Sequence, residues 1–85
     1  MSSSFTVYIL YSKTLDRFYI GATGDRLGER IRKHNTNHSG FTGKTNDWTL
    51  CHTEHFDSMT QALAREKEIK KRKSRKYIES LLANA

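Results

Sequence analysis

Five polar side chains in this sequence are of types that together can hydrolyse a phosphodiester bond: Tyr8, Tyr19, Arg30, His34 and Glu66. A single carboxylate can hold Mg²⁺, which keeps several waters and needs only one or two protein carboxylates. An arginine can stabilise the negative charge that develops on the phosphoryl oxygens, and a tyrosine or histidine can act as general base. If the fold brings these side chains together, the set predicts metal-assisted phosphodiester hydrolysis.

The identity of the general base stays open between Tyr19 and His34. A tyrosine hydroxyl has an ordinary pKa of about 10, so a nearby cation would have to lower that pKa before the phenol could accept a proton at neutral pH. Histidine titrates closer to neutral pH and is therefore a credible alternative.

The two tyrosines must be carried by strands. Residues 5–11 alternate in period two, residues 12–16 are polar, and residues 17–23 read as a second strand. The three segments together predict an antiparallel hairpin.

The register of this hairpin follows if the centre of the turn lies between Thr14 and Leu15. Tyr8 and Tyr19 are then diagonal neighbours on one face, and Gly21, opposite Tyr8, is expected to leave open space there. A slip by one residue would mix the two faces. This placement argues against core packing as the role of the tyrosines. The other face carries the apolar residues Phe5, Val7, Ile9, Phe18, Ile20 and Ala22.

A helix is predicted over residues 25–35, in which Leu27 and Ile31 face the core. Arg30 and His34 are four residues apart and lie on one side of that helix, next to the apolar stripe. A polar loop follows over 36–47, and an alternating third strand over 48–56, with Trp48, Leu50, His52 and Glu54 expected on one face.

The second predicted helix begins at Ser58, which forms a capping box with Gln61, and runs to about Lys73. Glu66 falls on its apolar stripe, where a carboxylate needs a partner or a metal. The partner could be Arg65, Lys67 or Lys70, of which Lys70 has the favourable spacing of four residues. The stripe itself is Met59, Ala62, Leu63 and Ile69.

Ser74 can cap a last short helix, which gives the element order β-β-α-β-α-α in the α+β class. The 85 residues predict a single domain over residues 1–85. Lys and Arg number 15 against 9 Asp and Glu, a net charge of +6, which favours nucleic acid as the partner. No apolar run approaches the ~20 residues that span a bilayer, and a single cysteine fits a reducing interior, so a cytoplasmic location is expected.

Other kinds of site have little support. His34 and His38 have metal-ligand spacing, but "HNTNH" lacks the glutamate of a metalloprotease helix and runs into a loop. "GATGDRLG" lacks the Lys-Ser/Thr ending of a phosphate-binding loop. No serine or cysteine hydrolase constellation is apparent.

Five segments in order resemble the GIY-YIG nuclease family, particularly its small stand-alone bacterial members, which are similar to the N-terminal nuclease domain of the excision-repair incision subunit. The segment "VYI" (7–9) keeps only the tyrosine of the first tripeptide, whereas "YIG" (19–21) is intact. "ERIRKH" (29–34) resembles the arginine-bearing helix. "GFTGKTNDWTL" (40–50) and "ALAREKEIKKRKSRK" (62–76) resemble the loop with the third strand and the metal-binding helix.

The resemblance implies a three-stranded antiparallel sheet flanked by helices and a Mg²⁺- or Mn²⁺-dependent DNA endonuclease that acts in DNA repair or recombination. It implies that Glu66 is the metal ligand, that Tyr19 is the general base or orients the water, and that Tyr8 supports the water or the phosphate. Arg30 would stabilise the transition state, and His34 would be a base or a phosphate contact.

Many members join this domain to a separate DNA-binding domain, which is not expected here, so the target would be chosen by the domain surface, an oligomer or a protein partner. The basic run from Lys70 to Lys76 is either a phosphate-contact strip or a solvated helix end. The alternatives to a nuclease are a nucleic-acid-binding module that keeps the fold without cutting and a purely structural partner domain. The nucleic-acid contacts predicted are Lys44, Lys70, Lys71, Arg72 and Lys73.

Overall fold

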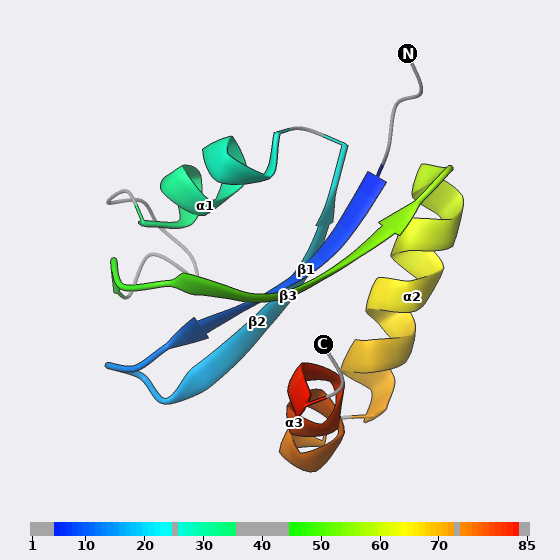
Figure 1. Ribbon diagram of the computed structural model, residues 1–85. Helices are drawn as coiled ribbons and strands as arrows, with labels where there is room; N and C mark the ends of the chain where they lie inside the picture. The colour runs from blue at the N-terminus through cyan, green and yellow to red at the C-terminus, as the bar shows by residue number, and fades with distance from the viewer. Residues whose placement is uncertain (1–4, 25, 36–44, 73, 84–85) are drawn as a thin grey trace.

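The chain folds into a three-stranded antiparallel sheet with helices on both faces, as predicted (Figure 1). The central strand of the sheet is the first in the sequence, and the second and third strands flank it. The elements are β1 (Phe5–Ser12), β2 (Arg17–Thr23), α1 (Leu27–Asn35), β3 (Thr49–Phe56), α2 (Met59–Arg72) and α3 (Arg75–Ala83).

The computed structural model describes four stretches of the chain, and the side chains of Lys33 and His34 lie outside that description although their backbone belongs to α1. No helix within these stretches has the length and apolar character needed to cross a membrane. The stretches are residues 5–24, 26–35, 45–72 and 74–83.

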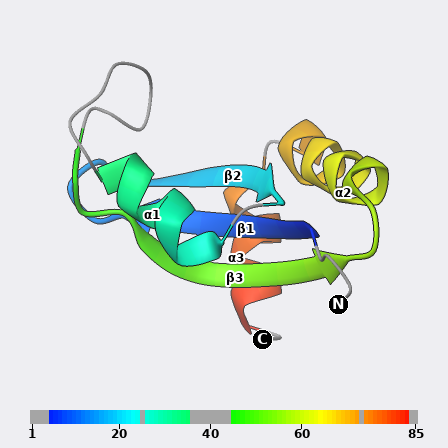
Figure 2. The same cartoon turned by 90° about the horizontal axis from the view of Figure 1, so that it is seen from above.

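The helices form two layers around the sheet. Seen from above, α1 lies on one side of the sheet and α3 crosses the other, while α2 runs alongside the β2 edge (Figure 2). The main packing partner of α2 is β2. Elements far apart in the sequence therefore meet at this edge. Tyr19 of β2 and Glu66 of α2 have to be brought together here.

The register of the hairpin is confirmed. Tyr8 pairs with Gly21 and Leu10 pairs with Tyr19. The alternation of side chains then separates two apolar clusters, one on each face of the sheet. On the α1 face, Tyr8, Leu10 and Trp48 are buried together with Leu27 and Ile31 packed on them. On the α2 and α3 face, the buried residues are Val7, Ile9, Ile20, Ala62, Ile69 and Ile78.

A β-bulge interrupts the pairing of β1 with β3. Ile9 pairs with His52, but the next residue of β1, Leu10, pairs with Leu50, so Cys51 is an extra residue on β3. An extra residue in one strand reverses the side to which the following side chains point.

The prediction that Trp48, Leu50, His52 and Glu54 point to the same face of the sheet is therefore wrong. Trp48 packs with Tyr8 on the α1 face, whereas Glu54 pairs with Val7 of β1 and reaches Arg65 of α2 on the opposite face. The bulge lets one strand contribute an aromatic ring to the first cluster and a carboxylate to the second.

The predicted N-terminal caps of α2 and α3 are confirmed. Ser58 Oγ accepts a hydrogen bond from the backbone N–H of Gln61 at 3.2 Å, and Ser74 Oγ accepts one from that of Tyr77 at 3.2 Å. Each satisfies a backbone donor that the first helical turn leaves unpaired. These caps fix where the two helices begin and hence which side chains face the sheet.

The stripe predicted for α2 is wrong at Leu63, whose side chain is 49% exposed. The inward positions are Met59, Ala62, Glu66 and Ile69, at alternating spacings of three and four residues. Leu63 follows Ala62 directly and is turned by about 100° around the helix axis. Glu66 therefore lies at an inward position, with its side chain only 19% exposed.

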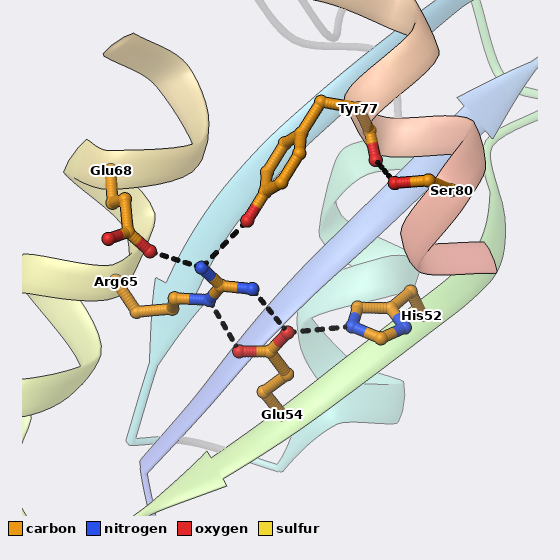
Figure 3. A network of polar contacts seen from close by, with 6 residues as sticks. All are labelled: His52, Glu54, Arg65, Glu68, Tyr77 and Ser80. Atoms are coloured by element: carbon orange, nitrogen blue, oxygen red, sulfur yellow. Dashed lines mark hydrogen bonds and ion pairs between the residues drawn. The ribbon is translucent and has the colours of Figure 1, made fainter. Parts of the chain in front are cut away.

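A polar network connects α2 and α3 to β3 on the face of the sheet opposite Tyr8 and Tyr19 (Figure 3). The guanidinium of Arg65 donates two hydrogen bonds to Glu54, at 2.7 and 3.0 Å, and others to Glu68 and to the Tyr77 hydroxyl. Glu54 also pairs with His52 Nε2 at 2.9 Å. Such two-pronged pairing of arginine with a carboxylate is geometrically specific, so the network fixes how α2 sits on the sheet.

This network makes stability depend on pH in the acid range. The hydrogen bonds from Arg65 hold the pKa of Glu54 below its ordinary value, despite the opposing effect of burial. A carboxyl whose pKa is lower in the folded state stabilises the fold above its unfolded pKa of about 4.3, and that stabilisation is lost as the pH falls through the folded pKa. We expect the difference in unfolding free energy between the wild type and Glu54→Gln to shrink from pH 7 to pH 3 in urea titrations. A constant difference across this range would show that the charge of Glu54 does not contribute.

Candidate active site

Tyr8 and Tyr19 lie side by side on the α1 face, with ring centroids 6.4 Å apart. Two expectations about them are corrected. Tyr8 is fully buried and belongs to the apolar cluster, so it packs in the core as well as carrying a polar group. Gly21 leaves no open space, because the Tyr8 ring fills it: a Cβ at Gly21 would lie 2.6 Å from the Tyr8 hydroxyl oxygen and 3.1 Å from Cε2 of Tyr19.

The absence of a side chain at Gly21 is thus what lets the Tyr8 hydroxyl take its position. We expect Gly21→Ala to displace this ring and to destabilise the fold by about 1–3 kcal/mol, as overpacking does. A displacement of about 1 Å in a catalytic group costs on the order of 100-fold in rate. Thermal unfolding and a nuclease assay measure the two effects.

Gly28 supplies the matched control, since a Cβ built there meets nothing within 4 Å. Gly28 lies in α1, where alanine is the better helix former by about 0.5–1 kcal/mol. Gly28→Ala should therefore be at least as stable as the wild type. Equal behaviour of the two variants would contradict the role assigned to the close approach at Gly21.

Trp48 closes the tyrosine side of the site and is positioned by Asn35 at the end of α1. The Asn35 amide donates to the Trp48 carbonyl at 3.0 Å and accepts from the Trp48 backbone N–H at 2.8 Å. The indole ring, which is 2% exposed, then meets the Tyr19 ring edge-on at a centroid distance of 6.2 Å. This pair of hydrogen bonds joins α1 to the start of β3.

Asp47 anchors the neighbouring segment to the turn between β1 and β2. It accepts hydrogen bonds from the hydroxyls of Ser12, Thr14 and Thr45 at 2.6–2.8 Å, and from the Thr14 backbone N–H at 2.9 Å. These donors, the Ser12 hydroxyl foremost, hold the pKa of Asp47 well below its ordinary range. The carboxylate is therefore ionised at neutral pH, and it fixes the chain just before Trp48.

Arg30 reaches the tyrosines from α1. Burial raises the pKa of the Tyr8 phenol above its ordinary value, and the hydrogen bond that the Arg30 guanidinium donates to it only partly offsets this effect. The phenol is consequently neutral at neutral pH. The Nε of Arg30 is buried and has no acceptor among the described residues. A buried donor left without a partner is rare and is typical of a group arranged for a ligand or an ordered water.

Glu66 approaches the same site from α2. Its negative charge raises the pKa of the Tyr8 phenol, which adds to the effect of burial. Of the alternatives left open for its partner, the structure shows Lys70, whose Nζ lies 2.6 Å from Glu66 Oε2. The same ammonium lies 5.9 Å from the centroid of the Tyr19 ring. Two strands and two helices therefore bring Tyr8, Tyr19, Arg30 and Glu66 together at one end of the β2 edge.

These residues fit a hard divalent cation of the kind that keeps most of its waters. Within the described stretches no group of three His, Cys, Asp or Glu side chains converges. Glu66 is partly exposed and already paired with the Lys70 ammonium. A lone carboxylate with water and substrate phosphate completes an Mg²⁺ coordination shell, whereas a zinc site needs at least three protein ligands.

The remaining predicted residues are distributed differently. His34 belongs to α1, but its side chain lies outside the described part of the chain, as do Lys44 and Lys73. Lys71 is exposed, and Arg72 stacks on the Tyr77 ring with Cζ 4.3 Å from the centroid. In the basic run, Lys70 therefore lies at the tyrosine site, whereas Arg72 contacts α3.

Two positioning residues, Asn35 and Asp47, were missed in the sequence. Both hold Trp48 or its segment by contacts between side chain and backbone that follow no periodic pattern. The available signal was local: an asparagine at the end of a predicted helix, and an aspartate directly before a tryptophan that begins a strand. Neither signal names the partner, because the partner is distant in the sequence.

Comparison with known proteins bears on this arrangement. The family model of the GIY-YIG catalytic domain matches residues 4–78, which include all four residues that converge at the β2 edge. Searches of curated proteins and of solved structures gave no match. Since the family model covers most of the sequence and the fold agrees with it, the chain belongs to the GIY-YIG catalytic domain family, which is a family of nucleases.

Proposed function

We propose that this protein is a Mg²⁺- or Mn²⁺-dependent endonuclease that hydrolyses phosphodiester bonds in DNA. The observation that carries the proposal is the set of groups around the Tyr8 phenol: Arg30 donates to it, the charge of Glu66 acts on it, and the Tyr19 ring lies beside the Tyr8 ring. These four side chains come from β1, β2, α1 and α2. Core packing alone does not require an arginine and a glutamate at this place.

In the proposed mechanism, Glu66 would hold the divalent cation, which when bound would supply Lewis-acid polarisation of the phosphoryl oxygen. Arg30 binds the negative charge that develops in the transition state, and its unpartnered Nε–H gives it a donor to spare. Burial keeps the pKa of Tyr8 above its ordinary value, so Tyr8 stays neutral and would donate a hydrogen bond rather than act as base. The proton of the attacking water then goes to Tyr19 or to His34.

Lys70 is the cation that neutralises Glu66 in the metal-free protein, with its Nζ 2.6 Å from Oε2. A divalent cation on Glu66 has to compete with this ammonium, because both need the same carboxylate. We expect Lys70→Gln to tighten Mn²⁺ binding about fivefold, since a partly exposed ion pair contributes about 1 kcal/mol. Calorimetric titration with Mn²⁺ in the absence of DNA measures the effect.

Lys71→Gln is the matched control, because it makes the same charge change one residue along, on an exposed side chain. If the two variants bind Mn²⁺ equally, the gain reflects net charge alone and Lys70 does not compete with the metal. If Lys70→Gln binds Mn²⁺ more weakly than the wild type, Lys70 supports the metal site and the competition is refuted.

The direct test of the proposed activity is a cleavage screen over branched, flapped and duplex DNA with Mg²⁺, with Mn²⁺ and with EDTA. Cleavage that requires the metal and disappears in Arg30→Ala supports the proposal. Salt-dependent binding of the whole panel without cleavage would overturn it and favour a nucleic-acid-binding module. The closed Glu66–Lys70 ion pair is the feature that favours this second candidate, because it satisfies the carboxylate without a metal.

We also propose that residues 1–85 act as one nuclease domain in DNA repair or recombination in the cytoplasm, with target choice by its own surface, an oligomer or a protein partner. The net charge of +6 supports DNA as the partner. The contacts proposed for the DNA backbone are those predicted, Lys44 and the run Lys70, Lys71, Arg72 and Lys73.

A further inference from the structure

We propose that a groove beside the tyrosine site binds an unpaired nucleotide of the DNA strand that is cut; the proposal rests on the nuclease function above. The groove has a volume of about 620 Å³. It lies between the turn that joins β1 to β2 and the junction of α2 with α3. A cavity of this size is within the range of small-molecule sites, which starts at about 300 Å³.

The floor of the groove is apolar. It is lined by Phe18 and Ile20 of β2, Ile69 of α2 and Ile78 of α3. Arg75 lies over the Phe18 ring, with Cζ 5.4 Å from the centroid. Aromatic and guanidinium planes are the surfaces on which unstacked bases bind, with about 1–3 kcal/mol per base.

The rim of the groove is cationic. Three cations, Arg17, Lys70 and Arg75, and one carboxylate, Asp16, line it. Lys70 is paired with Glu66 and Arg75 with Asp16 and Glu79, whereas Arg17 has no ion pair among the described residues. The carboxylate is already engaged, because Asp16 Oδ1 accepts from the Tyr11 hydroxyl at 2.6 Å and from Arg75 Nη2 at 2.8 Å. An apolar floor with a positive rim matches a ligand that joins a flat base to an anionic phosphate.

Lys70 connects the groove to the catalytic residues. Its side chain lines the groove, while its Nζ pairs with Glu66 and lies near the Tyr19 ring. Phe18 and Tyr19 are adjacent on β2, which is an edge strand, so their side chains lie on opposite faces of the sheet. A strand with its phosphate at Glu66 would therefore turn around this edge and place a neighbouring base against Phe18.

This path requires a base that is out of the duplex. A paired base stays stacked between its neighbours, and taking it out costs a few kcal/mol, whereas an unpaired base costs least. The groove therefore selects for DNA with a single-stranded segment next to the cut.

Nuclear magnetic resonance titration of the metal-free wild-type protein tests the groove directly. The probes are thymidine 5′-monophosphate, deoxyribose 5-phosphate and inorganic phosphate. We expect the nucleotide to shift the amides of residues 15–18, 69–70 and 74–78, and to bind at least about fivefold more tightly than the two probes without a base, since stacking contributes about 1 kcal/mol or more. Equal affinity for the three probes, or shifts elsewhere, would overturn the proposal.

Arg17→Ala and Lys76→Ala form the matched pair of variants. Both side chains are exposed and both changes remove one positive charge, but only Arg17 lines the groove. We expect Arg17→Ala to weaken nucleotide binding about fivefold, as loss of a charge contact of about 1 kcal/mol does, and Lys76→Ala to leave it unchanged. The same loss in both variants would refute a specific groove.

Fluorescence anisotropy with a Glu66→Gln protein extends the test to DNA. A labelled duplex with a single-stranded tail should bind more tightly than a fully paired duplex of equal charge, and Arg17→Ala should lose that preference. No preference in the parent protein would overturn the groove while leaving the nuclease proposal intact. A preference without any metal-dependent cleavage by the wild type would leave the groove and overturn the nuclease.

Discussion

Glu66→Gln should abolish metal-dependent DNA cleavage while the protein remains folded. The substitution keeps the size and the hydrogen-bonding capacity of the side chain but removes the charge that would hold the cation. Loss of an electrostatic element of this kind lowers the rate by about 10³-fold or more, equivalent to about 4 kcal/mol of activation free energy. Single-turnover cleavage with Mg²⁺ and with Mn²⁺ measures the loss, and circular dichroism checks the fold.

Glu68→Gln is the control for this experiment. Glu68 lies on the same helix two residues further on, is 55% exposed and contacts Arg65 on the other side of α2. It should cleave at the wild-type rate within about twofold. Equal rates for the wild type and Glu66→Gln would mean that the cleavage comes from a contaminant or that Glu66 is not the metal ligand. The double variant Glu66→Gln/Lys70→Gln should not show the gain in Mn²⁺ affinity that is expected for Lys70→Gln alone.

Arg65→Met should lower the free energy of unfolding substantially while leaving the residues around Tyr8 and Tyr19 unchanged. Removing the guanidinium leaves Glu54 partly buried, with His52 as its remaining ion-pair partner in the described part of the chain, and leaves the Tyr77 hydroxyl without this donor. Breaking a fully buried pair costs about 3–5 kcal/mol, and this pair is about one fifth exposed, so we expect about 2–3 kcal/mol. For a chain of 85 residues this corresponds to a decrease in Tm of about 10–20 °C.

Lys67→Met is the matched control. Lys67 lies two residues after Arg65 on the same helix, its side chain is exposed, and the change also removes one positive charge. Its effect should stay within about 0.5 kcal/mol. A similar loss of stability in the two variants would show that net charge, rather than the network of Figure 3, determines the result. Since Glu66 and Lys70 are on the other side of α2, correctly folded Arg65→Met at low temperature should retain metal binding.

The fold followed from the sequence wherever short-range rules decide the outcome. The hairpin register came from alternation combined with the position of the turn, and Tyr8 pairs with Gly21 as predicted. The starts of α2 and α3 came from serine caps that satisfy backbone donors, and both caps are present. In each case the partner lies in the same turn or in the neighbouring strand, so the local sequence pattern is enough to predict it.

The candidate site could be predicted less completely, because its geometry depends on contacts between distant segments. Periodicity placed Glu66 on the inward stripe of α2, but it could not choose among the cations that might pair with it. The choice of Lys70 depends on the β2 edge and on the Tyr19 ring beside it. The pairing of Tyr8 with Gly21 was predicted correctly, but the open space expected at Gly21 is filled by the Tyr8 ring. Only packing in three dimensions shows where that ring lies.

The bulge at Cys51 was not predictable for a similar reason. Alternation along residues 48–56 is unbroken in the sequence, and an extra residue shows only when the strand is paired with β1. Trp48 and Glu54 therefore appeared to share a face although they serve opposite sides of the sheet.

That bulge also bears on how the sequence can change over evolutionary time. Trp48 and Leu50, before Cys51, face the same side of the sheet as Tyr8, whereas His52 and Glu54, after it, face the side of Arg65. These two pairs of positions are therefore under different packing constraints. A substitution at Trp48 acts first on the cluster around Tyr8, and a substitution at Glu54 acts first on the anchoring of α2. The extra residue in β3 thereby lets one strand satisfy both sets of packing constraints.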